Sequence, residues 1–359
     1  MSEAKGSITR EGEVYPSPRR AVEYLPVDPP PPGHARPVAD RVWWGRIPLP
    51  MELNHINVWL MDDGEGWTVV DTGLCAEACQ TAWATLEAQP LAAKPLRRIF
   101  VTHDHADHTG LARWLAERHG AEVWMNGLTH QGIRDWLGEA TAARHERVAR
   151  FMRAHGLSAA ELKPISPAGE DTTGWFGGVP PLARACADGE EMHGAGRRWR
   201  MIEVDGHCRG HLCLWDRDGE VLISGDQVLP TISPNVSVLS IRPDDDPLRA
   251  FLASLDRLEH CAEGTLVLPS HGRPFRGLHR RLDVVRAHHR QQLDLLRAAC
   301  RERPHTAYEL LPTMFGRALR GFHRYLALGE TVAHLNYLWH GGELMRTADP
   351  QGVLRFQAA

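Results

Sequence analysis

The chain has 359 residues, a formal net charge of −4 and 43% hydrophobic residues, which suffices for one large domain, alone or with a small one, and a sizeable core. The slightly acidic balance excludes a general attraction to nucleic acid or to an anionic membrane. No apolar stretch approaches the roughly 18 residues of a membrane span, and no secretory signal is evident, so we expect a cytoplasmic protein without a membrane partner.

The N-terminal half is predicted to alternate between strands and helices. Residues 1–40 are polar and rich in proline, which predicts an extended or disordered arm. Apolar runs predict strands at 55–61, 67–71 and 98–102. Helical spacing predicts helices at 76–89 and 111–118. The polar helical pattern of residues 128–165 stands between core strands, and it therefore predicts an inserted helical cap.

The C-terminal half continues this mixture and then becomes helical. Strands are predicted at 199–204, 211–215, 221–224 and 265–268. Asp246 and Pro247 open a predicted helix that lies before the last of these strands. Residues 305–359 have the pattern of two helices, a turn and two short extended pieces. The order predicts a layered α/β main domain over residues 41–277 and a helical C-terminal region over residues 278–359.

The seven cysteines are odd in number and contain no Cys-x-x-Cys pair, which indicates reduced thiols rather than a disulfide framework. Histidine is the residue that stands out, with 21 copies. Because neutral imidazole is the commonest protein ligand for zinc-like ions, the places where histidines gather are candidate metal sites.

A dense histidine cluster follows directly on the predicted strand at 98–102, in the sequence Thr102-His-Asp-His-Ala-Asp-His-Thr-Gly110. The carboxyl edge of a sheet is where α/β proteins usually bind ligands. A solvated loop would account for two histidines, but not for His103, His105, Asp107 and His108 together. A divalent cation would satisfy them, because imidazole and carboxylate groups bind zinc, iron or manganese.

Three later segments repeat the pattern of an apolar strand that ends in a candidate ligand. These segments offer His207 and His211, then Asp226, and finally His271. A Gly-Asp pair after a strand is most often only a turn, so each segment alone is weak. Four such segments in this order indicate a metal site.

The His-x-His-x-Asp-His motif at 103–108 and the later elements resemble the metallo-β-lactamase-fold superfamily over about residues 47–275. The resemblance implies a four-layer αββα sandwich with a metal site at one end of its two sheets. It also implies a helical insert and a C-terminal helical, winged-helix-like extension. Two divalent ions are expected, with zinc in first place and iron or manganese as alternatives.

Carried over by position, the resemblance divides the ligands between two ions. His103, His105 and His207 would hold the first ion, Asp107, His108 and His271 the second, and Asp226 would bridge them. Asp107 and Asp226 are the candidates for proton transfer during catalysis. Asp71, in Val-Val-Asp-Thr-Gly73, matches a position that braces the histidine loop. His211 is assigned to the layer behind the ligands, or to the core.

Two departures from particular relatives argue against a dedicated β-lactamase and against an enzyme that reduces oxygen. Asp226 stands where β-lactamases of the superfamily commonly have cysteine, and His105 stands where flavodiiron oxidases have glutamate. The ligand set looks instead like that of glyoxalase II, lactonases and phosphodiesterases. The segment Ala333–Gly342 with Glu343–Arg346 is similar to the winged-helix extension of the β-lactamase-like-protein-2 group, some members of which cleave RNA.

The leading hypothesis is a binuclear metal-dependent hydrolase that cleaves a small ester, thioester or lactone through a metal-bound hydroxide. A phosphodiesterase or endoribonuclease is the alternative, because many arginines between residues 273 and 303 accompany the winged-helix-like segment. Without a nucleic-acid partner, these arginines would simply form the solvent-exposed face of a helix. A third hypothesis is a catalytically vestigial metal-binding protein that uses the C-terminal region for interactions.

Substrate choice is expected to depend on the loops around the metals, at residues 48–55, 128–165 and 230–236. His55 and Asn235 are candidate polar contacts to a small-molecule substrate, although either equally fits a structural role. The sequence leaves open whether the chain forms a homodimer. It also leaves open whether the C-terminal region binds nucleic acid, substrate or a second subunit.

Overall fold

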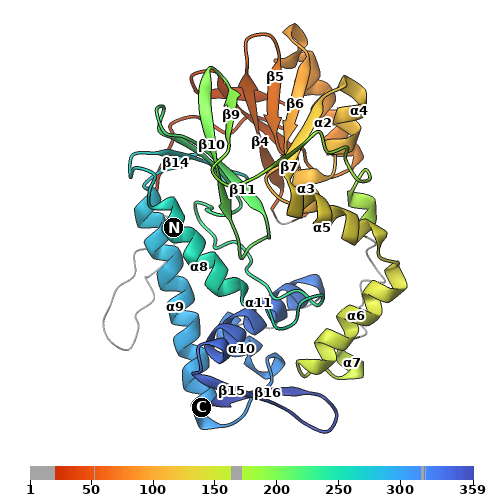
Figure 1. The fold of residues 1–359 in the computed structure, drawn as a ribbon, viewed down its shortest axis with the longest axis vertical. Helices are drawn as coiled ribbons and strands as arrows, with labels where there is room; N and C mark the ends of the chain where they lie inside the picture. Colours follow the sequence, from red (N-terminus) through yellow and green to blue (C-terminus); the bar gives the residue numbers. More distant parts are fainter. Residues whose placement is uncertain (1–20, 52, 163–171, 317–318, 320) are drawn as a thin grey trace, which may run out of the picture.

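Two seven-stranded sheets pack face to face in the computed structural model, which describes residues 21–51, 53–162, 172–316, 319 and 321–359 (Figure 1). The first sheet has the order β2 (Ala35–Ala39), β3 (Val42–Pro48), β4 (His55–Asp62), β5 (Trp67–Val70), β6 (Leu96–Phe100), β7 (Glu122–Asn126) and β8 (Arg184–Cys186). The second has the order β1 (Glu23–Tyr24), β14 (Phe275–Arg276), β13 (Leu266–Pro269), β12 (Val221–Gly225), β11 (His211–Asp216), β10 (Arg197–Val204) and β9 (Glu191–Gly194).

Both sheets are mixed. Strands β5 to β8 of the first sheet are parallel, and so are β12 and β13 of the second, whereas the other neighbours are antiparallel. The space between the sheets is filled by fully buried large side chains, among them Trp44, Trp59, Phe100, Trp199 and Leu214. Burying each such side chain is worth about 1.5–3 kcal/mol, so this layer is a major source of stability.

Helices cover the outer faces of both sheets. On the first sheet, α2 (Glu77–Ala88) and α4 (Ala112–His119) bury apolar side chains, and η1 (Leu91–Ala93) follows α2. On the second sheet, α8 (Pro247–Leu258) and the first turns of α9 (Leu278–Glu302) do the same. Asp246 caps α8 by accepting a hydrogen bond from the Arg249 amide, as its position before Pro247 predicted. The expected αββα sandwich is confirmed (Figure 1).

Three helices lie in the insert between β7 and β8: α5 (Gly127–Gly138), α6 (Thr141–Ala154) and α7 (Ala159–Leu162). Residues 163–165 of the predicted insert lie outside the described residues, and η3 (Thr172–Trp175) follows. The side chains of Phe151 and Met152 join the apolar cluster of the C-terminal helices. The insert therefore connects the first sheet to the C-terminal region, as the course of α6 in Figure 1 shows.

The C-terminal region consists of helices followed by a hairpin. After α9 come η4 (Tyr308–Leu310), α10 (Leu311–Phe315), α11 (Gly321–His340) and the antiparallel pair β15 (Leu344–Ala348) and β16 (Leu354–Ala358). This is the predicted order of helices and extended pieces. Whether the arrangement acts as a winged helix stays an interpretation. Side chains of α9 and α11 share one core cluster with the second sheet.

The predicted arm is partly built into the sheets. Residues 1–20 lie outside the described residues, but β1 pairs with β14 and β2 pairs with β3. The main-chain hydrogen bonds of these strands extend both sheets by one edge strand. The two sheets therefore include residues 23–24 and 35–39, which precede the predicted boundary at residue 41.

None of the described helices is long and apolar enough to cross a membrane. All seven cysteines are free thiols, which agrees with their interpretation as reduced residues.

The buried side chain of Asn57 connects the two sheets beside the end of β13. Its Oδ1 accepts a hydrogen bond from Trp44 Nε1 at 2.7 Å. Its Nδ2 donates to the carbonyl oxygens of Pro269 and Gly272, at 2.7 and 2.9 Å. One side chain on β4 thus satisfies three buried groups and holds the loop that carries His271.

We expect the substitution Asn57→Ala to lower the free energy of unfolding by about 2–4 kcal/mol, because it leaves three buried polar groups without partners. Urea unfolding followed by circular dichroism measures this change. The matched control is Asn54→Ala at an exposed asparagine, with an expected change within about 0.5 kcal/mol. Equal stability of the two variants would contradict the role assigned to Asn57.

Candidate metal centre

All candidate ligands follow the carboxyl ends of strands that meet at one end of the sandwich. β6 leads into the loop with His103 and His105 and then into the short helix α3 (Ala106–Thr109). His207 lies between β10 and β11, Asp226 follows β12 directly, and His271 follows β13. The folding of four separate strands therefore brings these side chains together.

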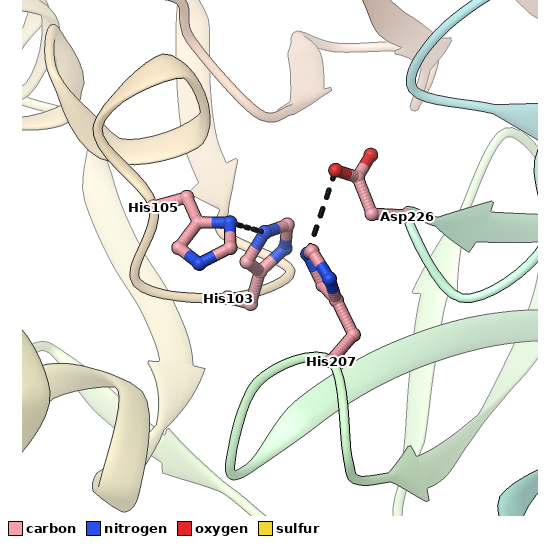
Figure 2. A group of neighbouring side chains, drawn as sticks. All are labelled: His103, His105, His207 and Asp226. Atoms are coloured by element: carbon pink, nitrogen blue, oxygen red, sulfur yellow. Dashed lines mark hydrogen bonds and ion pairs between the residues drawn. The ribbon is translucent and has the colours of Figure 1, made fainter. Parts of the chain in front are cut away.

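The first group consists of His103, His105, His207 and Asp226. One ligand atom from each of these residues lies within 4.8 Å of the others. The Nε2 of His103 and the Nδ1 of His105 are 3.0 Å apart, and the Nε2 of His207 is 3.5 Å from Asp226 Oδ2. Figure 2 shows the rings of His103, His105 and His207 gathered beside the carboxylate of Asp226, with His103 and His105 on one loop and His207 on another.

The second group consists of Asp107, His108 and His271, whose ligand atoms also lie within 4.8 Å of one another. Asp107 Oδ2 is 3.3 Å from His271 Nε2 and 3.6 Å from His108 Nε2. Asp226 Oδ1 lies 3.6 Å from each of the same two nitrogens. Asp226 therefore presents one oxygen to each group, which is the position that a bridging carboxylate requires.

Hydrogen bonds determine which nitrogen of three rings is free to bind a cation. The Nδ1 of His207 lies 2.7 Å from the carbonyl oxygen of Asn235, and the Nδ1 of His271 lies 2.8 Å from that of His55. Carbonyl oxygens only accept, so each Nδ1 carries a proton, and in the neutral ring that binds a cation each Nε2 carries a lone pair. His108 makes the corresponding contact, at 2.8 Å, with the Asp71 carboxylate.

These free atoms are buried and lack hydrogen-bond partners. The Nε2 atoms of His108, His207 and His271, together with Asp226 Oδ1, have no partner among the described residues. Buried polar atoms are normally paired, because an unpaired one costs about 1–3 kcal/mol. Since the four atoms converge, a divalent cation in each group would satisfy them, and the residues fit a binuclear metal site.

The charges around the two groups differ. Burial and the neighbouring His108 ring lower the pKa of His103 well below its usual range, and burial with the His207 ring lowers that of His105 to about 3. Burial alone would also lower the pKa of His108 and of His271, but the carboxylates around them raise both values. The same carboxylates attract a cation, and they are concentrated at the second group.

Asp71, which the resemblance assigned to the support of the histidine loop, contacts both ends of that loop. It is buried at the end of β5, with a left-handed backbone (φ +63°) that few residues other than glycine adopt. Its Oδ1 accepts a hydrogen bond from the Thr102 amide at 2.9 Å, while Oδ2 faces His108 Nδ1. Asp71 thus holds both the beginning of the loop and one ligand.

His211 lies behind the ligands. Its ring is fully buried, and its centroid is 4.7 Å from that of the His103 ring. A Cβ atom at Gly225 would lie 2.2 Å from His211 Nε2, so only glycine fits before Asp226. His211 therefore packs between the first ligand group and the strand that carries the bridging aspartate.

The two predicted substrate contacts act on the ligands through their main chains. The carbonyl oxygens of His55 and Asn235 orient His271 and His207, as described above. The His55 ring accepts from the Gly272 amide and contacts Asn54, and the Asn235 side chain contacts Ser237 and Glu330. Both side chains therefore already have partners within the chain. No side-chain pattern could have indicated this role, because the groups involved are main-chain carbonyls.

Three further residues lie near the site but are not among the predicted site residues. The thiol of Cys208 donates to Asp104 Oδ1 at 2.5 Å, and these two residues form a third ligand-like group with His105. Glu330 of α11 accepts a hydrogen bond from Asn235, and its burial raises the pKa of its carboxyl group to about 7. The C-terminal region therefore reaches the loop that orients His207, although the two are far apart in the sequence.

Comparisons with known proteins agree with this geometry. Residues 51–271 match the family described as the metallo-beta-lactamase superfamily, and residues 293–359 match the metallo-beta-lactamase-like C-terminal domain. A solved beta-lactamase domain protein from Burkholderia ambifaria is 39% identical, with a TM-score of 0.88 over 95% of this chain and 99% of that one.

Curated relatives are more distant. The "Probable metallo-hydrolase YqjP" of Bacillus subtilis is 24% identical over 82% of this chain and 90% of its own length. The "Acyl-coenzyme A thioesterase MBLAC2" of Gallus gallus is 26% identical over 54% of this chain and 65% of its own length.

We expect the group Asp107–His108–His271 to release its cation at a higher pH than the group His103–His105–His207. A protonated imidazole cannot bind a metal, and the pKa values of His108 and His271 are raised, so protons displace this cation first as the pH falls. The lowered pKa values of His103 and His105 keep those rings neutral until the solution is much more acidic.

Elemental analysis after dialysis from about pH 8 down to about pH 4 measures this release, and two separate steps are expected. The variant His271→Ala should retain only the step at lower pH. A single step in the wild-type protein, in which both ions leave together, would contradict the assignment.

Proposed function

We propose that this chain, which belongs to the metallo-β-lactamase superfamily, is a metal-dependent hydrolase that cleaves a thioester, ester or lactone with an apolar acyl chain. The observation that carries the proposal is the convergence of unpartnered imidazole nitrogens around the shared carboxylate of Asp226. His103, His105 and His207 would hold one ion, and Asp107, His108 and His271 the other. Ions bound there would polarise the substrate oxygen and lower the pKa of water to about 7.

Asp107 is the better candidate for moving a proton. Its side chain is 19% exposed, compared with 10% for Asp226, so it has more room for a water molecule and a leaving group. Burial opposes its ionisation, but the His108 and His271 side chains hold its pKa at about 2. The ionised carboxylate accepts a proton from the attacking water and returns it to the leaving group.

The exposed apolar residues support an acyl chain as part of the substrate. Among the described residues, six of the eight exposed large apolar side chains lie in or close to the three predicted rim segments. They are Leu53, Leu128, Trp136, Ile232, Leu239 and Ile241. Such a concentration is typical of a binding surface rather than of a solvated face.

Contacts bring the helical insert close to the histidine loop and to the loop after Asp226. Leu128 and Trp136 lie one helical turn on either side of Gly132, and a Cβ at Gly132 would touch Asp104 of the histidine loop. Arg147 of α6 donates to Ser240, whose neighbours in the chain are Leu239 and Ile241. The insert therefore contacts both the histidine loop and the loop after Asp226, and exposed apolar residues lie beside both contacts. The MBLAC2 relative, named as an acyl-coenzyme A thioesterase, has a compatible substrate class.

The endoribonuclease alternative has less support, because arginines of α9 are engaged within the chain. Arg281 donates to the carbonyl oxygens of Leu229 and Ile232. Arg286 pairs with Asp256, and Arg297 pairs with Glu343. These contacts favour a structural role over a surface for a phosphate backbone.

The function is tested by assaying the metal-loaded protein with acyl thioesters, a lactone and bis-p-nitrophenyl phosphate. We expect thioester or lactone turnover, and Asp107→Ala should lower kcat/KM by about 10²- to 10⁴-fold. The matched control is Asp188→Ala, at a half-exposed carboxylate that pairs with Arg257 and belongs to neither ligand group, and it should retain full activity. Metal content is measured for both variants.

Other outcomes would favour the alternatives. Turnover of the phosphodiester alone, followed by RNA cleavage, would favour the endoribonuclease. Two bound metals without turnover of any of these substrates would favour the vestigial metal-binding protein.

We also expect kcat/KM to rise with acyl chain length, by about fourfold for each added methylene that is buried, which corresponds to about 0.8 kcal/mol. Ile232→Ser should weaken this dependence, because Ile232 is 44% exposed on the loop after Asp226. Leu295→Ser on α9, at a residue 38% exposed, is the matched control. Equal slopes for both variants across butanoyl, hexanoyl and octanoyl thioesters would argue against an acyl site at the rim.

A further inference from the structure

We propose that Ser233 determines substrate specificity. Two buried histidines keep its hydroxyl proton engaged, so the hydroxyl group can only accept a hydrogen bond from the substrate. The inference rests on the proposed hydrolase function and adds a requirement to it. The substrate should carry an N–H or O–H donor near the bond that is cleaved. Ser233, His289 and His334 do not belong to either ligand group.

A chain of three hydrogen bonds leads from α11 to Ser233. His334 Nδ1 lies 2.8 Å from the main-chain oxygen of Glu330. His334 Nε2 lies 3.1 Å from His289 Nδ1, and His289 Nε2 lies 3.1 Å from the hydroxyl oxygen of Ser233. Both imidazole rings are fully buried between α9, α11 and the loop after Asp226.

The carbonyl at one end determines the direction of every hydrogen bond in this chain. A carbonyl oxygen only accepts, so His334 Nδ1 must carry a proton. In a neutral ring the Nε2 of His334 then accepts, which requires His289 Nδ1 to donate. The Nε2 of His289 accepts in turn, and its only available partner in this chain is the hydroxyl proton of Ser233.

Both rings are neutral in this environment. Burial lowers the pKa of His334 to about 4, and burial with the adjacent His334 ring lowers the pKa of His289 well below its usual range. A proton added to either ring would reverse the chain, but it would place a charge in a buried site. At neutral pH the hydroxyl of Ser233 therefore donates to His289 and retains only its two lone pairs for other partners.

Ser233 belongs to a loop that runs from one ligand group to the other. At one end of the loop, Pro230 packs against Gly272 so closely that a Cβ there would lie 2.6 Å from Pro230 Cγ, next to His271. At the other end, the carbonyl oxygen of Asn235 orients His207. Ser233 stands between these points and is only partly buried, with the exposed Ile232 beside it.

Helix α9 holds this loop in place. The buried guanidinium of Arg281 on α9 donates to the carbonyl oxygens of Leu229 and Ile232, both at 2.6 Å. The position of the Ser233 hydroxyl is therefore set before a substrate arrives, and so is its polarity. An ordinary serine could rotate its proton toward either a donor or an acceptor, whereas this one discriminates between them.

A pair of thioesters that differ in one atom tests this polarity. Butanoyl-N-acetylcysteamine carries an amide N–H near the thioester sulfur, and S-(2-acetoxyethyl) butanethioate has an ester oxygen in its place. We expect the metal-loaded protein to prefer the amide compound by about 3- to 10-fold in kcat/KM, the value of one hydrogen bond. Ser233→Ala should abolish the preference, and Ser233→Thr, which keeps the hydroxyl, should retain it.

The control is Ser158→Ala, at an exposed serine beside α7, and it should leave the preference unchanged. Equal turnover of both thioesters by the wild-type protein would overturn the inference. A preference that survives in Ser233→Ala would overturn it as well.

A measurement that does not depend on turnover separates this inference from the proposed function. Nitrogen-15 NMR of the histidine side chains, assigned by comparison with His334→Gln, should show the proton of both His289 and His334 on Nδ1. A proton on Nε2 of His289 would overturn the inference even if thioesters are hydrolysed. If neither thioester is hydrolysed the proposed function fails, and the position of these protons alone decides the polarity of Ser233.

Discussion

The burial of several imidazole and carboxylate groups at one end of the sandwich is the constraint on which the site depends. Three imidazole nitrogens and one carboxylate oxygen converge there without hydrogen-bond partners among the described residues. Such an arrangement is costly unless a cation satisfies it, since buried polar atoms are otherwise paired. Asp226 connects the two halves of this arrangement, because each of its oxygens faces a different group of ligands.

The second layer of the site consists largely of main-chain groups. The carbonyl oxygens of His55 and Asn235 orient one ligand in each group, and the carboxylate of Asp71 orients His108. Fixed outer partners of this kind determine the tautomer of a metal-binding histidine and its direction. The sheets supply these partners, since Asn57 connects β4, which begins at His55, to the loop that carries His271.

The C-terminal helices are part of the same arrangement. α9 holds the loop after Asp226 through Arg281 and His289, and α11 contacts it through Glu330 and supports His289 through His334. The insert contacts the C-terminal region, where Tyr308 donates to Glu161, and it contacts the loop after Asp226, where Arg147 donates to Ser240. The loop that carries the proposed specificity residue is therefore positioned by segments that lie far from the metal ligands in the sequence.

The sequence by itself predicted seven of the fourteen strands of the two sheets and the main helices, because apolar periodicity is a local property. The histidines and aspartates that follow strands marked the candidate metal site, and the family resemblance assigned its seven ligands. The edge strands β1 and β2 could not be predicted, since they are stabilised by pairing with distant β14 and β3 rather than by their own composition. The roles of the His55 and Asn235 carbonyls and the partners of His289 were likewise decided only by the tertiary structure. Main-chain groups are the same in every residue, so what they contact depends on how the chain folds and not on which side chains it carries.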